Sequence, residues 1–334
     1  MVLKRAFLSC YIARNCRTLS YSRSYHSSSI TTKRLLPPLS LLPEPIMSDL
    51  SQSSSPLHHP TTIPPSGQGV EVLTDKNNKR RYIVNRNPSD DSILHERILC
   101  ADRFEIDDKI ANISNYRDET WSNLSLTQRL KYVGDALSHV FNNDENKNGG
   151  GKLEILARMI SNEMGKTLLE SREELSDFQS VRKEMLDLVG KANEPVSLSE
   201  DCGVIGRIDR EPLGTIAIIS PWNYPVLEIL LHLVPALVAG NAAIVKPSEV
   251  TPMSGAMIVE WLKEWRGVSS DYGVIRLPVE IVQGDGEVGK TLVSHEGVHS
   301  VSMTGSSVTG RKIMEECGKS LKRVILEVSE STIF

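Results

Sequence analysis

IISPWNYPVLEILLHLVPALVAGNAAIVKPSE, residues 218–249, is the stretch of the chain that predicts its fold. It runs from an apolar β-rich segment through a polar turn into an apolar helix, and then into a second β-rich segment and a second polar turn. Trp222-Asn223 follows the first strand, and Lys246 and Glu249 follow the second. Because ligands bind at the carboxyl ends of strands in open parallel sheets, both turns are expected to face one crevice.

The same alternation continues from Gly214 to residue 328. Strands alternating with helices predict βαβ units, and right-handed crossovers then give a doubly wound, Rossmann-like α/β fold with a parallel sheet. The expected strands are 215–220, 242–246, 280–283, 299–303 and 323–328, and the expected helices are 226–239, 253–265, 288–294 and 309–317.

Residues 80–213 are expected to form a helical scaffold with one strand, to which we assign no chemistry. Ser125, followed three residues later by Gln128, matches a capping box. The expected elements are a strand within 82–88, a helix from Ser125, a helix at 153–164 that ends at the C-cap Gly165, and a third helix through Leu169, Leu175 and Phe178.

The composition is that of a soluble globular protein, with 40% hydrophobic and 24% charged residues among 334. A formal net charge of −4 gives no reason to expect a nucleic-acid partner. The richest apolar run, residues 226–238, is too short to span a bilayer. The five cysteines are too widely spaced for a disulfide framework or a zinc site, so no metal is expected: Cys10, Cys16, Cys100, Cys202 and Cys317.

Residues 1–46 are rich in Arg and Ser and contain no acidic residue before Glu44. That composition is typical of an organelle transit peptide, so mitochondrial import is expected. Met47 opens a second plausible start, and initiation there would leave the protein in the cytosol. Residues 47–79 hold too few apolar side chains to order themselves and are expected to be a disordered linker.

Three motifs occur in order: PWNYP at 221–225, KPSE at 246–249 and MTGSSVTG at 303–310. With them, residues 80–327 resemble the NAD(P)-dependent aldehyde dehydrogenase superfamily. The resemblance implies oxidation of a small aldehyde to a carboxylic acid through a cysteine thiohemiacetal, with NAD or NADP as the hydride acceptor. It also implies a homo-oligomer for full-length members, which is doubtful for this chain.

The resemblance gives catalytic roles to two residues. Asn223 would donate a hydrogen bond to the oxyanion, although on its own it reads as an ordinary turn residue before Tyr-Pro. Glu327 would act as the general base that activates water. Val328-Ser329-Glu330 stands where the family has L-G-G, so residues 329–334 are a divergent terminus.

The resemblance also assigns cofactor contacts. Lys246 and Glu249 would hold the adenosine ribose, and a carboxylate there favours NAD over NADP. The residues themselves indicate that Gly305 permits a tight turn and that Ser306 and Ser307 cap the following helix, whose N-terminus attracts the pyrophosphate. The full set is Ser220, Pro221, Trp222, Lys246, Ser248, Glu249, Gly286, Gly289, Thr304, Gly305 and Ser306.

The cysteine nucleophile of the family lies beyond the position of Glu327, and Cys317 precedes it. Because hydride transfer needs the thiohemiacetal, we expect no catalytic domain and no activity from this polypeptide alone, and poor solubility from the apolar surface left exposed.

Two other interpretations stay open. One is a non-catalytic nucleotide-binding module, a regulatory partner of a full-length relative. The other is a short-chain reductase, which would need a Tyr-x-x-x-Lys pair that neither Tyr132 nor Tyr272 provides.

Overall fold

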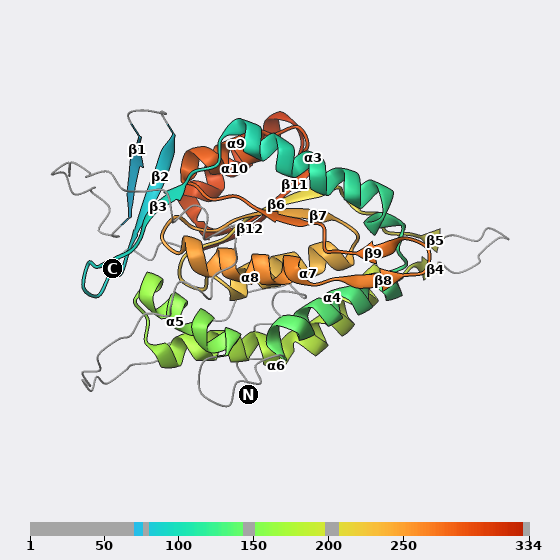
Figure 1. Cartoon of the computed structure of the whole chain (residues 1–334). Coiled ribbons are helices and arrows are strands. Elements are labelled where there is room, and N and C mark those ends of the chain that lie inside the picture. Colours follow the sequence, from blue (N-terminus) through green and yellow to red (C-terminus); the bar gives the residue numbers. More distant parts are fainter. Residues whose placement is uncertain (1–69, 76–79, 143–150, 198–206, 330–334) are drawn as a thin grey trace.

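A parallel five-stranded sheet forms the centre of the protein, in the order β10-β7-β6-β11-β12 (Figure 1). The computed structural model describes residues 70–75, 80–142, 151–197 and 207–329. The predicted transit peptide, most of the predicted linker and residues 330–334 lie outside the described residues. The sheet strands are β6 (Thr215–Ile219), β7 (Ala242–Lys246), β10 (Val279–Ile281), β11 (Ser300–Ser306) and β12 (Arg323–Ser329).

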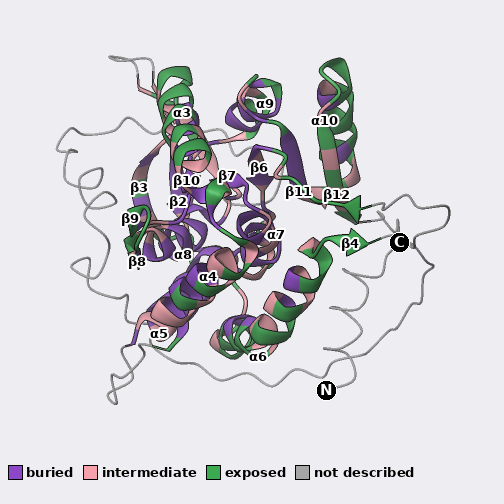
Figure 2. Ribbon diagram, turned by 90° about the vertical axis from the view of Figure 1, so that its right-hand side faces the viewer, coloured by how far each residue is buried: buried purple, intermediate pink, exposed green. Residues whose placement is uncertain are grey.

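Helices cover both faces of this sheet, so the predicted doubly wound α/β fold is confirmed (Figures 1 and 2). One face carries α7 (Leu227–Val238) and α8 (Pro252–Glu264). The other carries α3 (Arg103–Glu119), α9 (Gly286–Ser294) and α10 (Ser307–Lys319). The chain passes from β6 through β7 to β10 and then returns to β11 beside β6. The strand order therefore reverses between β6 and β11, where ligands bind in such folds.

The strand register brings the predicted site residues toward one edge of the sheet. Ile219 at the end of β6 pairs with Lys246 of β7 on one side and with Met303 of β11 on the other. Thr304 of β11 pairs with Glu327 of β12. Both polar turns and the end of β11 thus lie on the carboxyl side of the sheet.

Helix α7 is buried nearly all round because it lies between the sheet and a second layer of helices (Figure 1). This layer consists of α4 (Leu126–Phe141), α5 (Lys152–Met164) and α6 (Leu168–Asn193). Side chains from outside the sheet region also bind the carbonyl groups at the end of α7. Trp121 Nε1 donates to the carbonyl of Leu237 at 2.9 Å, and Arg129 Nε donates to the carbonyl of Val238 at 2.9 Å.

The predicted scaffold helices are present, with one error of detail. Ser125 caps α4 through a complete capping box with Gln128. Gly165 ends α5 with φ 84°, a conformation that favours glycine. Leu169, predicted as part of the buried stripe of α6, is 64% exposed, whereas Leu175 and Phe178 are buried. The apolar stripe of α6 instead begins at Leu168, which is half-buried and packs against the core.

A small antiparallel sheet precedes α3, formed by β1 (Glu71–Thr74), β2 (Arg81–Arg86) and β3 (Ile93–Leu99). Strand β2 confirms the strand predicted within 82–88. Strand β1 falls inside the predicted linker, so the linker boundary at residue 79 is wrong. Every second residue of β1 is half-buried, and the backbone pairing with β2 orders the segment.

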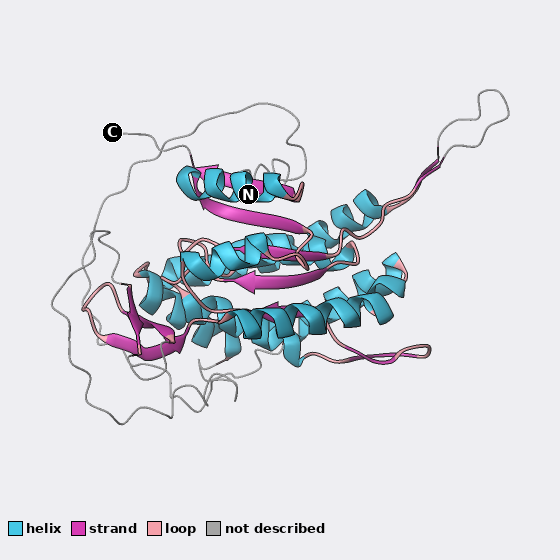
Figure 3. Ribbon diagram, turned by 90° about the horizontal axis from the view of Figure 1, so that it is seen from above, coloured by secondary structure: helices cyan, strands magenta, loops and turns pink. Residues whose placement is uncertain are grey.

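Several short elements were not predicted. They are the 3-10 turn η2 (Trp121–Asn123), and two hairpins that project from the same end of the molecule (Figure 3). The hairpins pair β4 (Val196–Ser197) with β5 (Arg207–Ile208), and β8 (Gly267–Ser269) with β9 (Gly273–Ile275). Within the described parts of the chain, no helix has both the length and the apolar character to cross a membrane.

Candidate cofactor and active site

Lys246 lies at the end of β7 and is buried beneath the turn that follows it. Its Nζ donates to the carbonyls of Pro247 at 2.8 Å and Gly284 at 2.6 Å, and lies 3.4 Å from Oε2 of Glu249. Burial lowers the pKa of Lys246, and the Glu249 carboxylate opposes that shift. The Glu249 side chain is 37% exposed, so its carboxylate can accept further hydrogen bonds from a ligand.

The start of α9 lies against the same lysine. Gly284 has φ 149°, which only glycine adopts readily, and this turns its carbonyl toward Lys246. Asp285 caps α9 by accepting from the amides of Glu287 and Val288. A Cβ atom on Gly289 would lie 3.6 Å from Cε of Lys246, whereas one on Gly286 would meet nothing within 4 Å. The space in front of Gly286 is therefore open.

Ser220, which begins the polar turn after β6, is hydrogen-bonded to Lys246. Its backbone N–H donates to the carbonyl of Lys246 at 3.1 Å. Its hydroxyl is buried and has no hydrogen-bond partner among the described residues. Pro221 is half-buried and Trp222 is 37% exposed. The hydroxyl of Ser248 accepts from the amide of Val250 at 3.2 Å and so shapes the second turn.

Of the two predicted caps, Ser306 caps α10 at the end of β11 by accepting from the amide of Thr309 at 3.2 Å, whereas Ser307 is the first residue of α10. The expectation that Gly305 permits a tight turn is wrong. Gly305 lies within β11, pairs with Val328 and needs no positive φ, because α10 begins directly after the strand. A Cβ there would lie 2.8 Å from Cε of Met303, the flexible end of a side chain that would have to move.

Thr304 belongs to a polar chain that also contains two residues of α7. Thr304 Oγ1 donates to Glu228 Oε2 at 3.1 Å and lies 2.9 Å from His232 Nε2. His232 Nδ1 lies 2.8 Å from the hydroxyl of Ser302. Burial lowers the pKa of His232 to about 4, so the ring is neutral at pH 7. A neutral ring that donates to Thr304 must then accept from Ser302.

Glu327 lies beside these hydrogen-bonded side chains, because it pairs in register with Thr304 across β11 and β12. Burial raises the pKa of Glu228, and the charge of Glu327 raises it further. The two carboxyl groups are therefore close enough to interact.

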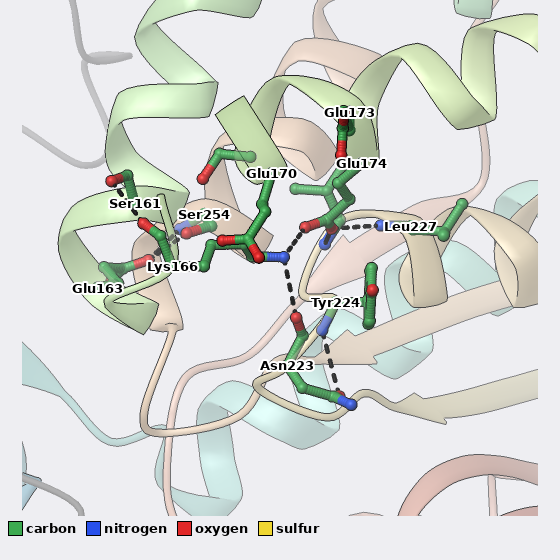
Figure 4. Close-up of polar contacts among 12 residues, drawn as sticks. Ser161, Glu163, Lys166, Glu170, Glu173, Glu174, Asn223, Tyr224, Leu227 and Ser254 are labelled. Carbon is green, nitrogen blue, oxygen red and sulfur yellow. Dashed lines mark hydrogen bonds and ion pairs between the residues drawn. The ribbon is translucent and has the colours of Figure 1, made fainter. Parts of the chain in front are cut away.

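Asn223 follows β6 on the exposed PWNYP turn (Figure 4). Its Oδ1 accepts from the amide of Tyr224 at 3.2 Å. Its backbone carbonyl accepts from Nζ of Lys166 at 3.0 Å. The structure thus places Asn223 on the same side of the sheet as the ends of β7 and β11, and ties it to the scaffold.

The sequence model of the aldehyde dehydrogenase family matches residues 74–331, more than half of the chain. The chain belongs to this family. The resemblance inferred from PWNYP, KPSE and MTGSSVTG is confirmed.

Curated family members and solved structures agree. Aminoaldehyde dehydrogenase 1, peroxisomal, of Pisum sativum is 35% identical over 260 residues, which are 75% of this chain and 48% of that protein. Betaine aldehyde dehydrogenase of Bacillus subtilis is 33% identical, over 62% of this chain and 39% of that protein. PnpE from Pseudomonas sp. WBC-3, solved with nicotinamide adenine dinucleotide, has a TM-score of 0.62 and 29% identity, and the match covers 74% of this chain and 47% of PnpE. The chain therefore spans about half the length of these aldehyde dehydrogenases or less.

Only two cysteines lie in the part of this aldehyde dehydrogenase chain that the structure describes, Cys100 and Cys317, and both are buried. Burial raises the pKa of each thiol. A thiol that is buried and protonated is a poor nucleophile. Neither described cysteine is therefore placed to act as a nucleophile.

Four polar residues around the site were not identified from the sequence: Lys166, Glu174, Glu228 and His232. A usable signal was present. Glu174 lies in the buried stripe of α6 beside Leu175, and Glu228 and His232 are spaced i, i+4 on an otherwise apolar helix. A charged or polar residue on a buried face predicts a buried partner.

Proposed function

We propose that this chain forms the NAD(P)-binding half of an aldehyde dehydrogenase, which oxidises an aldehyde to a carboxylic acid. The observation that carries the proposal is the pair Lys246 and Glu249. A buried ammonium holds a half-exposed carboxylate beside the glycine-flanked start of α9. The pair lies at the end of β7, the strand next to the topological switch point.

The residues present fit an adenine dinucleotide. Glu249 can accept from ribose hydroxyls, and the amides at the start of α10, with Ser306, offer donors for the pyrophosphate. The buried hydroxyl of Ser220 lacks a partner among the described residues, and a bound ligand would supply one. When bound, the nicotinamide ring supplies the acceptor for the hydride of the aldehyde.

Asn223 and Glu327 are the proposed catalytic residues. The amide of Asn223 would donate to the oxyanion that forms when a thiolate adds to the aldehyde. Glu327 would remove a proton from the water that hydrolyses the thioester. Because the two described cysteines are buried, we propose that residues 70–329 bind the cofactor without oxidising an aldehyde.

Calorimetric titration of the full chain with NAD and with NADP tests the cofactor assignment. We expect saturable binding and a preference for NAD, since the Glu249 carboxylate repels a 2′-phosphate. Glu249→Gln should lose that preference. Glu264→Gln, which changes an exposed carboxylate on α8, is the matched control and should keep it. A folded chain that binds neither nucleotide would exclude this function.

The burial of both described cysteines also favours a second function, a non-catalytic nucleotide-binding module that acts with a full-length relative. Reduction of NAD by the purified chain can be measured with betaine aldehyde and with an aminoaldehyde, the substrates named in the two curated relatives. Nucleotide binding without turnover is the result that both functions predict for this chain alone. Turnover would exclude the module.

We further propose mitochondrial import, supported by the basic, acid-poor composition of residues 1–46. The Pisum sativum relative is named as peroxisomal. Fusion of residues 1–46 to a fluorescent protein would test the proposal, and diffuse or peroxisomal fluorescence would contradict it.

A further inference from the structure

Lys166 and Glu174 form an ion pair inside the protein, between the loop after α5 and helix α6 (Figure 4). Lys166 Nζ lies 2.6 Å from Glu174 Oε2, and their side chains are 8% and 0% exposed. Two charges withdrawn from water cost several kcal/mol, so such a pair is a weak source of stability. The role of the pair is therefore inferred from the groups that it contacts.

Glu174 binds the start of α7 with its other oxygen. Oε1 accepts from the amides of Val226 at 2.9 Å and Leu227 at 3.0 Å. These amides begin α7 and have no partner within the helix. The N-cap residue of α7 is Val226, whose side chain cannot accept a hydrogen bond and so does not cap the helix. A carboxylate at a helix N-terminus also interacts favourably with the helix dipole.

Lys166 binds the other part of the same turn. Its Nζ donates to the carbonyl of Asn223 at 3.0 Å and lies 4.4 Å from the ring centroid of Tyr224, a cation–π contact. Together the pair makes contacts with Asn223, Tyr224, Val226 and Leu227. One buried ion pair from the scaffold thus fixes both ends of the turn that follows β6.

We propose that Lys166 is a positioning residue for Asn223, acting together with Glu174. The inference rests on the proposed function, because it assigns a purpose to the orientation of Asn223. An oxyanion donor must be held to within a fraction of an ångström, and a turn whose side chains are exposed cannot achieve that alone. The ion pair supplies the constraint from a rigid helix pair.

The double variant Lys166→Met/Glu174→Gln tests this without leaving a lone buried charge. The new amide oxygen can still accept from the start of α7, so the fold should persist. We expect hydrogen exchange at Tyr224, Val226 and Leu227 to rise about tenfold, since charge-assisted hydrogen bonds are lost. Acrylamide quenching of the four tryptophans, of which Trp222 lies on the turn, should increase. NAD affinity should fall several-fold.

The matched control is Lys152→Met. Lys152 also pairs with a carboxylate, Glu264, at 3.0 Å, and its Nζ lies 5.3 Å from the ring centroid of Trp261. Both of these partners are on α8 and not on the turn. The variant should leave exchange at Val226 and Leu227 unchanged. Lys166→Arg keeps the charge and should restore most of the protection. A role in global stability alone would raise exchange throughout the described part of the chain and not only at the turn.

Tyr224→Leu removes only the cation–π contact at an exposed site, so the test survives if the double variant fails to fold. It should raise exchange at Val226 and Leu227 about twofold. Unchanged exchange and quenching in the substituted proteins would overturn the inference. Failure of the unsubstituted chain to bind NAD would instead overturn the proposed function, and the exchange data would still decide the role of Lys166.

Discussion

Glu163 is a carboxyl group enclosed by the protein, near the end of α5. It accepts from Asn85 Nδ2 at 2.9 Å, from the amide of Met253 at 2.9 Å, and from the amide and the hydroxyl of Ser254. Burial raises the pKa of Glu163 to about 7, although all these donors favour the charged form. The group therefore joins α5, β2 and the start of α8 while it titrates near neutrality.

The pH dependence of stability follows from that shift. The folded pKa lies above the usual value of 4.5. The stability that Glu163 contributes is therefore fully present below pH 4.5 and is lost as the pH rises through 7. A shift of this size corresponds to about 3 kcal/mol. Between pH 5 and 8, the free energy of unfolding in urea of Glu163→Gln should rise relative to that of the unsubstituted protein by roughly that amount. Parallel stability curves would show that Glu163 does not titrate in this range.

At the residue scale, sequence reasoning identified residues at strand ends but not their partners. Lys246 and Glu249 could be found because they are three residues apart on one turn. Lys166 and Asn223 are 57 residues apart, and their contact exists only after α6 packs on α7. Spacing along the chain carries no information on such a pair.

At the scale of elements, two substitutions of Ser306, the cap of α10, can distinguish its structural role from a role in cofactor binding. Ser306→Ala should destabilise the protein by about 1 kcal/mol through loss of the cap. Ser306→Asp is also a good cap, so stability should be kept, but its charge should weaken NAD binding about tenfold by repelling the pyrophosphate. Urea unfolding and calorimetric titration measure the two effects.

Ser125→Asp is the matched control for that experiment. Ser125 caps α4 in the same way and is exposed, and it lies in the scaffold. It should change neither stability nor NAD affinity by much. Equal NAD affinity in Ser306→Asp and the unsubstituted chain would mean that the pyrophosphate does not bind at α10.

Regular elements were predictable and irregular ones were not. Strand β7 has its predicted bounds because a short apolar run between Asn241 and Pro247 is too short for a helix and is compatible only with a buried strand. Helix α3 was missed because only Ile106, Ile110 and Ile113 of its residues are buried, a stripe too narrow to stand out among polar residues. The two hairpins are too short to show a period of two.

For the whole molecule, β12 is the last strand at one side of the described sheet (Figure 2). Two of its apolar residues, Ile325 and Val328, are exposed. Ile325 is 46% exposed on β12, and Met314 is 53% exposed on the adjacent α10. Exposed apolar edge strands favour association. We expect concentration-dependent self-association by light scattering, and Ile325→Lys should raise the monomer fraction. A monodisperse monomer of the unsubstituted chain at high concentration would contradict this expectation.

Helix α7 depends at both ends on groups that come from outside residues 214–328. Glu174 binds its first amides, and Trp121 and Arg129 bind its last carbonyls. The boundary between scaffold and sheet is therefore a boundary in sequence but not in hydrogen bonding. Exchange of the sheet region between two relatives is therefore expected to destabilise α7 unless the recipient scaffold keeps these three side chains.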